Sequence, residues 1–319
     1  MKIIFMGTPD FALPGLNEIY RRGIEIAAVV TRPDQPAGRG KRITASPVKE
    51  RGLELGLEVW QPASLKDTDF LDRIREVSPD LVVVSAYGKF IPDKVLSLAR
   101  YRGINLHPSL LPRYRGAAPI QWALINGDPQ TGVTIIEVAE KMDAGNIYGQ
   151  RSVDILPDDN AGSLSQRLAD AGGILLADVV ELIERGEADP RLQDENKVTL
   201  APRISKEDGR INWHGSATDI NNRIRGFYPW PGAFTTISTL KGIRSIKIIR
   251  AQVLDGGGGS PGEVLEADGD ILIISTGDGT LRLLDIQLEG KRPLAAAEFL
   301  RGCRIVSGDI LGKNQEGNQ

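Results

Sequence analysis

The sequence predicts an α/β protein of two domains, with a doubly wound, mostly parallel sheet first and a small antiparallel β-barrel after it. Short apolar runs, each suited to one buried strand, alternate with helical segments over the first half of the chain. Beyond about residue 205, short strands recur between turn signals instead. The length of 319 residues suits two such domains.

The first domain opens with the apolar run Lys2–Met6, which predicts a strand covered on both faces. A tight turn, Gly7–Asp10, leads into a helix to about Arg22, and it lacks the glycine spacing and the lysine of a phosphate loop. The strand–helix–strand order predicts right-handed crossovers. The further elements expected are helices at 46–55 (with Ser46 as N-cap), 69–76, 117–126 and 163–184, and strands at 26–30, 59–60, 81–84, 131–138 and 146–155.

One connection, residues 31–49, is far longer than usual and carries little apolar periodicity. It holds three prolines, two glycines and five basic residues against Asp34. Two interpretations stay open from the composition: a solvated flexible loop, or an arm that docks on phosphate groups.

The run Gly103–Pro112 contains the strongest candidate site. Its first half predicts a buried strand, on which Ile104 and Leu106 face one side while Asn105 and His107 face the other. Pro108 ends the strand. An amide and an imidazole therefore point the same way at a strand end, where open α/β sheets bind ligands.

Bulk composition excludes several classes of protein. A net charge of −3 gives no overall nucleic-acid signal, so an RNA partner would have to be met by local basic patches. The single cysteine, Cys303, excludes an internal disulfide, and with only two histidines a protein-built zinc site is not expected. No window approaches the roughly 18 to 20 apolar residues of a membrane span. Since the first residues already form a core strand, we expect no signal or transit peptide and a cytoplasmic location.

The second domain is expected to begin with a helix at 216–225. Five strands should follow, at 234–240, 243–253, 262–267, 271–276 and 281–288. Residues 187–204 are polar, carry two prolines and predict a linker. We therefore expect a first domain over 1–186, a linker over 187–204, a second domain over 205–312 and a tail over 313–319.

The residues Asn105 and His107, together with the run Ser109-Leu110-Leu111-Pro112, resemble the signature of the folate-dependent formyltransferases. These enzymes move a formyl group from 10-formyltetrahydrofolate to an amine. Asp143 alone reads as a turn aspartate, but it matches the family's carboxylate that meets the histidine. The resemblance implies that Asn105 donates a hydrogen bond to the developing oxyanion and that protonated His107 adds charge. Asp143 would hold His107 in the useful tautomer or keep it protonated, and could accept a proton from the amine.

The same resemblance implies a folate pocket and no metal. The residues implied to contact folate are Ser109, Leu110, Leu111, Pro112, Ala86, Tyr87, Gly88, Ile91, Val138 and Ala139. Whether the Leu111–Pro112 bond is cis is left open.

Four further stretches resemble one subfamily, the methionyl-tRNA formyltransferases: Phe5–Ala12, Arg32–Lys41, Ile204–Ile211 and Phe227–Ala233. This resemblance implies initiator methionyl-tRNA as acceptor, an OB-like second domain that assists tRNA binding, and a monomer. The implied tRNA-binding residues are Arg32, Arg39, Lys41, Arg42, Lys206, Arg244 and Lys247.

Three other functions compete with this interpretation. A formyltransferase for a nucleotide-linked amino sugar would use the same catalytic residues but would need no basic arm. A glycinamide ribonucleotide formyltransferase would lack the second domain. A non-catalytic RNA-binding protein would use the barrel and the arm alone, and would not require Asn105, His107 and Asp143.

Overall fold

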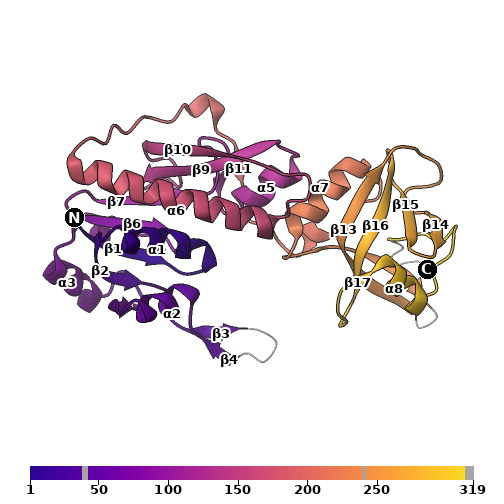
Figure 1. The fold of residues 1–319 in the computed structure, drawn as a ribbon, viewed down its shortest axis with the longest axis horizontal. Coiled ribbons are helices and arrows are strands. Elements are labelled where there is room, and N and C mark those ends of the chain that lie inside the picture. Colours follow the sequence, from indigo (N-terminus) through magenta and orange to yellow (C-terminus); the bar gives the residue numbers. More distant parts are fainter. Residues whose placement is uncertain (38–41, 240–241, 313–319) are drawn as a thin grey trace. The chain divides into compact units, whose positions relative to one another are not determined.

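A computed structural model of the chain describes residues 1–37, 42–239 and 242–312 (Figure 1). The chain divides into two units. The first comprises Met1–Pro119, Gln130–Asp154 and Ser165–Ala201, and the second comprises Ile120–Pro129, Ile155–Leu164 and the chain from Pro202 onward. Segment 187–201, which reads as a linker in the sequence, thus packs with the first unit.

The first unit is built around one seven-stranded sheet in the order β10-β9-β7-β6-β1-β2-β5. β1, β2, β5, β6 and β7 run parallel to one another. β9 is antiparallel to β7, and β10 is antiparallel to β9. The chain winds outward from β1 in one direction to β5, then returns to β6 and proceeds in the other, which confirms the doubly wound fold. The strands are β1 (Lys2–Gly7), β2 (Glu25–Val30), β5 (Val59–Trp60), β6 (Leu81–Ser85), β7 (Gly103–His107), β9 (Gln130–Glu137) and β10 (Ile147–Asp154).

Helices cover both faces of this sheet (Figure 1). On one face, Val82 and Val84 of β6 belong to a core shared with α3 and α4. On the other face, the backbone of α6 passes close to Leu106, and α1 packs near Phe5 and α6. The helical segments before residue 202 are η1 (Asp10–Ala12), α1 (Leu13–Arg21), α2 (Pro47–Glu54), α3 (Thr68–Val77), α4 (Asp93–Leu96), α5 (Pro119–Ile125), α6 (Ala161–Arg185) and η2 (Glu195–Lys197). Of these, α5 lies in the second unit except for its first residue.

Two short ladders in this unit were not expected from the sequence. β3 (Gln35–Ala37) and β4 (Arg42–Thr44) pair within the basic connection, where the sequence predicted no strand. Pro36 and the mixed polar composition gave no strand signal. β8 (Arg115–Gly116) pairs in parallel with β11 (Leu200–Ala201), which ties residues 199–201 to the segment that follows β7.

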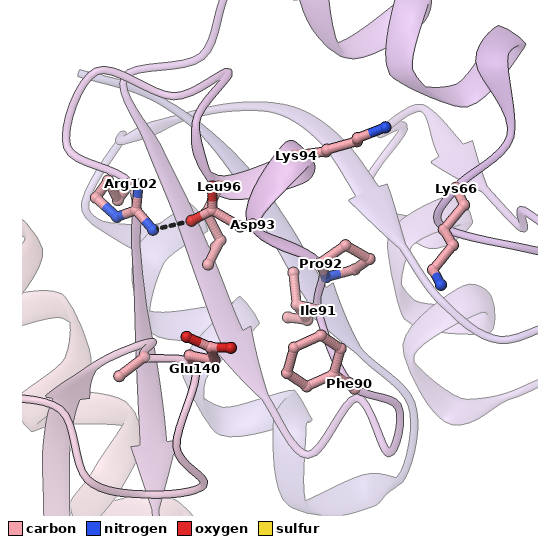
Figure 2. Close-up of a pocket in the computed structure, with 10 residues that line it drawn as sticks. Lys66, Phe90, Ile91, Pro92, Asp93, Lys94, Leu96, Arg102 and Glu140 are labelled. Carbon is pink, nitrogen blue, oxygen red and sulfur yellow. Dashed lines mark hydrogen bonds and ion pairs between the residues drawn. The ribbon is translucent and has the colours of Figure 1, made fainter.

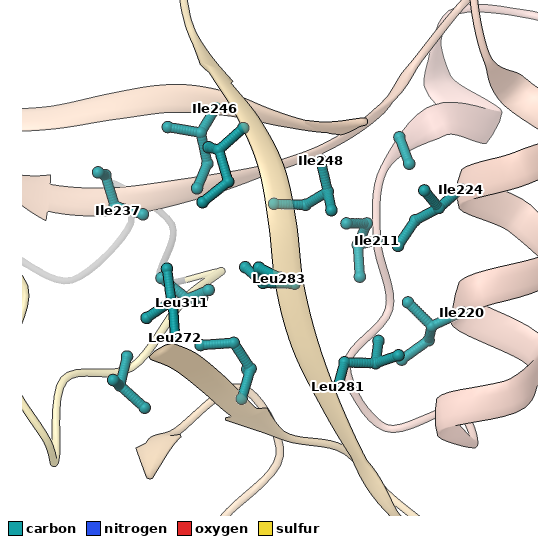
Figure 3. Packing of buried hydrophobic residues seen from close by; sticks show 14 of the residues in the cluster. Ile211, Ile220, Ile224, Ile237, Ile246, Ile248, Leu272, Leu281, Leu283 and Leu311 are labelled. Atoms are coloured by element: carbon teal, nitrogen blue, oxygen red, sulfur yellow. The ribbon is translucent and has the colours of Figure 1, made fainter. Parts of the chain in front are cut away.

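The second unit is a curled antiparallel sheet whose core also takes side chains from helices (Figure 3). Its strands follow the order β12-β13-β16-β15-β14, and β17 pairs with β16. Ile220 and Ile224 of α7 point toward the sheet side chains, four residues apart on one helix face. The elements are η3 (Glu207–Gly209), α7 (Ala217–Phe227), β12 (Ala233–Thr239), β13 (Gly242–Leu254), β14 (Val264–Asp268), β15 (Ile271–Ser275), β16 (Thr280–Leu288), β17 (Leu294–Ala295) and α8 (Ala296–Gly302).

The gap between the two end strands, β12 and β14, is bridged by the segment after α8. Val264 of β14 exchanges hydrogen bonds with this segment, accepting from Gly308 N at 2.8 Å and donating to Asp309 O at 2.8 Å. Gly312 N donates to Thr236 O of β12 at 2.9 Å. These bonds satisfy backbone groups that two free sheet edges would expose. The expected small barrel is therefore present as a curled sheet completed by a C-terminal segment.

Candidate active site

Strand β7 places Asn105 and His107 on the same face of the sheet. Its parallel register with β6 pairs Val82 with Gly103 and Val84 with Asn105, and partners in a parallel pair point to the same side. Both valines belong to the core under α3 and α4. Asn105 and His107 therefore face α3 and α4, as the alternation in the sequence predicts.

The buried imidazole of His107 has one proton fixed by the backbone. Its Nε2 lies 3.0 Å from the carbonyl oxygen of Tyr114, and since a carbonyl only accepts, Nε2 carries the hydrogen and donates it. Nδ1 faces the Asp143 carboxylate, with 3.6 Å between Nδ1 and Oδ1. Nδ1 is therefore the nitrogen that gains or loses a proton, and it does so beside a carboxylate.

Burial lowers the pKa of His107 below its usual value, while the Asp143 carboxylate and the hydrogen bond to Tyr114 act in the opposite direction. Burial is the larger effect because the charged imidazolium loses its solvation. The free site thus favours a neutral imidazole near pH 7. In that neutral state the Tyr114 carbonyl fixes the tautomer, because Nδ1 then carries no hydrogen that it could donate to the Asp143 carboxylate.

Asp143 is held in a tight loop after β9. Its backbone φ is +52°, which is uncommon for a residue with a side chain. Carboxylate Oδ2 accepts a hydrogen bond from Gly116 N at 2.9 Å. A Cβ at the nearby Gly145 would lie 1.9 Å from the carbonyl oxygen of Glu137, so this glycine lets the loop close onto β9.

Asn105 is half-buried, and its side-chain amide makes no hydrogen bond to the residues that the structure describes. An amide that makes no hydrogen bond within the protein has its N–H groups available to a ligand oxygen.

Hydrogen bonds fix the backbone of residues Ser109 to Pro112. The Thr134 hydroxyl donates to Ser109 O at 2.6 Å and accepts from Leu111 N at 3.2 Å. Gln150 Nε2 donates to Leu111 O at 2.8 Å. Leu110 packs against Gly132, and the Leu111–Pro112 bond is cis. None of these four residues lines the cavity described next.

Figure 2 shows a cavity of about 520 Å³, whose lining residues Ile91 and Leu96 belong to the same core as Val82 and Val84. It therefore lies on the sheet face toward which β7 directs its polar side chains. It includes two of the residues expected to contact folate, Ile91 and Ala139, while Tyr87 is buried in the core and Val138 packs against it. Ala86 and Gly88 lie on the same turn with φ values of +47° and +81°. The lining residues are Lys66, Phe90, Ile91, Pro92, Asp93, Lys94, Leu96, Arg102, Ala139 and Glu140.

Several of these lining residues were missed by sequence reasoning. Phe90 is 68% exposed, and Figure 2 shows its ring beside Ile91. Asp93 and Arg102 form an ion pair in the wall, and Lys66 and Lys94 add two ammonium groups. Charged residues spread over three loops and α4 give no sequence pattern, but the aromatic residue two positions after Gly88 was a usable signal.

The basic connection is anchored at its base. Asp34 accepts from Lys49 Nζ at 2.7 Å and from Gln61 Nε2 at 2.7 Å. The Arg32 guanidinium lies close to Gly88, at the turn after β6. Arg39, Lys41 and the side chain of Arg42 lie outside the described residues.

The expected tRNA-binding residues of the second unit lie on its surface. Lys206 is exposed and precedes η3. Arg244 and Lys247 are half-exposed on β13, and Lys247 Nζ donates to Pro231 O at 2.7 Å. Two further arginines in this unit, Arg210 and Arg223, stack over Phe234 and Phe227 at 5.4 and 5.7 Å from the ring centroids.

Within the described part of the chain, no group of three or more histidine, cysteine, aspartate or glutamate side chains is arranged to hold a metal ion. None of the helices there is long and apolar enough to cross a membrane.

The chain matches two protein families: "Formyl transferase" over residues 1–180 and "Formyl transferase, C-terminal domain" over residues 203–304. It is 42% identical to the methionyl-tRNA formyltransferase of Caldanaerobacter subterraneus subsp. tengcongensis over 98% of this chain and 100% of that one. It is 44% identical to the methionyl-tRNA formyltransferase of Thermodesulfovibrio yellowstonii over 96% of this chain and 97% of that one.

Solved structures share the fold at lower identity. WlaRD, described as a sugar 3N-formyl transferase and crystallised with dTDP and 5-N-formyl-THF, superimposes with a TM-score of 0.65 at 19% identity, covering 92% of this chain and 99% of that one. HypX from Aquifex aeolicus in complex with tetrahydrofolic acid gives a TM-score of 0.62 at 21% identity, covering 94% of this chain but 47% of that longer one.

Proposed function

Because this chain belongs to the methionyl-tRNA formyltransferase family, we propose that it transfers the formyl group of 10-formyltetrahydrofolate to the α-amine of methionyl initiator tRNA. The observation that carries the chemistry is that Asn105 and His107 share one face of the sheet, while the Asp143 carboxylate lies 3.6 Å from Nδ1 of His107. The reaction would prepare the amino acid that begins a protein chain.

The residues of the cavity fit a folate. Phe90, Ile91, Leu96 and Ala139 offer apolar contacts to a flat ring, and Glu140 offers hydrogen-bond acceptors to its polar edge. Lys66 and Lys94 are cationic partners for the carboxylates of the glutamate tail. Bound there, 10-formyltetrahydrofolate supplies an activated formyl carbon.

Three side chains then act on the attacking amine and the formyl oxygen. An α-amine has a reference pKa of roughly 7.7 to 8.0, so a useful neutral fraction exists at pH 7. The Asn105 amide donates a hydrogen bond to the formyl oxygen as negative charge develops on it, and one such donor is worth roughly 3 to 4 kcal/mol.

The His107–Asp143 pair accepts the proton that the attacking amine loses. Tyr114 holds the proton on Nε2, so the proton of the amine reaches either Nδ1 of His107 or the Asp143 carboxylate beside it, directly or through a water. General acid–base help of this kind contributes roughly 10²- to 10⁴-fold. The imidazolium formed during the step adds positive charge close to the oxyanion. The pair would then return the proton to N10 of tetrahydrofolate as the bond between N10 and the formyl carbon breaks.

The two domains expected from the sequence have different roles in this proposal. We propose that residues 1–186 carry the reaction, that residues 205–312 assist tRNA binding, that 187–204 connect them and that 313–319 form a tail. The expected phosphate contacts are Arg32, Arg39, Lys41, Arg42, Lys206, Arg244 and Lys247. A charged tRNA as acceptor implies a cytoplasmic enzyme, and a site built from one chain is sufficient for a monomer.

The direct test follows a labelled formyl group. Purified protein is incubated with 10-[¹⁴C]formyltetrahydrofolate and methionyl initiator tRNA, and label on acid-precipitated tRNA is counted. Label that appears only with enzyme, and that is lost when the ester bond to tRNA is hydrolysed, is the expected result. Folate binding without any transfer to tRNA would contradict the proposed acceptor.

A further inference from the structure

The segment that leads out of the first unit, residues 191–201, lies against the backbone partners of both His107 and Asp143. Arg191 exchanges backbone hydrogen bonds with Ile147 at 2.7 and 2.9 Å, just after the Asp143 loop. The Thr199 hydroxyl accepts from Tyr114 N at 2.9 Å, and Tyr114 is the residue whose carbonyl accepts from His107. This segment, which reads as a connector in the sequence, is therefore linked to the His107 imidazole by two successive hydrogen bonds through Tyr114.

Gln193 makes the most specific contacts in this segment. Its Nε2 donates to Asp143 O at 2.8 Å and to Gly145 O at 2.8 Å. Its Oε1 accepts from Arg115 Nε at 3.1 Å and Nη2 at 2.8 Å. Both N–H groups and the carbonyl oxygen are thus engaged, and the reversed amide would place like groups together. This fixes the orientation of the amide.

Arg115 gives Gln193 a rigid support. The Arg115 side chain is 4% exposed and also binds the Glu195 carboxylate, with 2.7 Å from Nη2 to Oε1. Its backbone lies in β8, paired with β11. The next residue, Gly116, donates its N–H to the Asp143 carboxylate. Two consecutive residues of β8 therefore hold Asp143, one directly and one through Gln193.

We propose that Gln193 is a positioning residue for the formyl transfer reaction: its amide holds the backbone of the Asp143 loop so that the carboxylate faces Nδ1 of His107. Without the two N–H donors, the Asp143 and Gly145 carbonyls lose their partner and the loop relaxes away from the imidazole. The Gly116 N–H alone then restrains the carboxylate. The inference rests on the proposed function, because the consequence is measured in formyl transfer.

The decisive variant is Gln193→Glu, which keeps an acceptor for Arg115 but cannot donate to the two carbonyl oxygens. Gln193→Ala removes both sides of the bridge. Each should lower kcat for methionyl-tRNA by about 10- to 100-fold, since small displacements of reacting groups are costly. The affinity for tetrahydrofolate, measured by calorimetry, should stay within about threefold because Gln193 does not line the cavity. Gln166→Glu, a surface glutamine bonded to Asp170, is the matched control.

The outcomes separate positioning from a merely structural role. If Gln193→Glu turns over like the wild type, the amide serves only as a hydrogen-bond acceptor for Arg115 and the proposal fails. Loss of tetrahydrofolate binding together with turnover would also overturn it, because the pocket itself would have collapsed. Wild-type protein is assayed in parallel, so a failure of the proposed function shows as no transfer in any sample.

A second readout needs no turnover. The chain has two histidines, His107 and His214, and His214 lies in the second unit. In ¹H–¹³C spectra, the His107 imidazole signal should shift in Gln193→Ala, while the His214 signal should stay in place. A His107 signal identical to that of the wild type would contradict a role in placing the carboxylate.

Discussion

The imidazole of His107 lies between two partners of different chemistry, and this asymmetry decides which of its nitrogens reacts. The Tyr114 carbonyl retains the Nε2 proton, so only Nδ1 exchanges a proton with its surroundings. Nδ1 faces Asp143 at a distance longer than a good hydrogen bond, 3.6 Å. A substrate group or a water can therefore exchange a proton with Nδ1 of His107 and the Asp143 carboxylate.

Removing either the amide or the imidazole should reduce turnover far more than folate binding. Asn105→Ala and His107→Ala should each lower kcat by about 10²- to 10³-fold, because each removes stabilisation of charge that develops during transfer. Single-turnover formyl transfer measures the effect, and tetrahydrofolate affinity serves as the check on folding. His214→Ala, in the second unit, is the control. Near-normal kcat in Asn105→Ala or His107→Ala would remove that residue from the mechanism.

Burial of His107 should also appear in the pH dependence of stability. Its pKa in the folded protein lies below the ordinary 6.5, so between the two values the unfolded chain binds more protons. Stability should therefore rise with pH up to about 6.5, by at most about 1.4 kcal/mol per pH unit from this group. Urea unfolding from pH 5 to 7.5 should show a shallower slope in His107→Gln. Equal slopes in the two proteins would contradict a buried, neutral histidine.

Single residues differ in how much of their role the sequence can predict. Asn105 and His107 followed from strand alternation and a proline stop, both of which are local. The neutral state of His107 depends on burial under distant elements, and its tautomer depends on Tyr114, so neither has a local signal. Gln193 looked like any polar linker residue because its partners are 48 to 78 positions away.

At the level of elements, periodicity predicted most helices and strands because burial on one or two faces leaves a repeat in the sequence. Ser46 was predicted as the N-cap of α2 because capping is local: its hydroxyl accepts a hydrogen bond from the N–H of Lys49, three residues later. Ladders of two or three residues, such as β8 with β11, are too short to leave a repeat. α8 was missed because no capping side chain marks its start.

The loop between β9 and β10 should be intolerant of a single methyl group. In Gly145→Ala the added Cβ would meet the Glu137 carbonyl oxygen, so the loop must move outward and take Asp143 with it. We expect a loss of about 1 to 3 kcal/mol in unfolding free energy and a kcat reduced at least tenfold. Gly257→Ala, with open space around it, is the control for urea unfolding and turnover. Unchanged kcat in Gly145→Ala would mean that the loop position does not matter.

For the whole molecule, charge distribution matters more than net charge. A chain with a formal charge of −3 gains no general attraction to RNA, so binding must come from local basic groups. The connection at 31–49 concentrates five basic residues and is fixed at its base by Asp34, Lys49 and Gln61. A basic segment that is fixed at its base suits contact with phosphate groups.

Neutralising that connection should affect tRNA but not folate. The triple change Arg39→Gln, Lys41→Gln and Arg42→Gln should lower kcat/KM for methionyl-tRNA and reduce the slope of its logarithm against log salt by about 0.9 per lost phosphate contact. Tetrahydrofolate affinity should not change. The control replaces Arg21, Arg75 and Arg185, three exposed arginines in helices, by glutamine. The same salt dependence in the triple variant and the wild type would leave the basic connection a solvated loop.

The most direct measurement compares acceptors. The protein is given 10-formyltetrahydrofolate with methionyl initiator tRNA in one reaction and a dTDP-linked amino sugar in another, and formyl transfer to each is followed over time. We predict rapid transfer to the tRNA and none to the sugar above the enzyme-free rate. Transfer to the sugar alone would keep Asn105, His107 and Asp143 as the catalytic residues but would contradict the assignment of the basic connection and the second unit to tRNA.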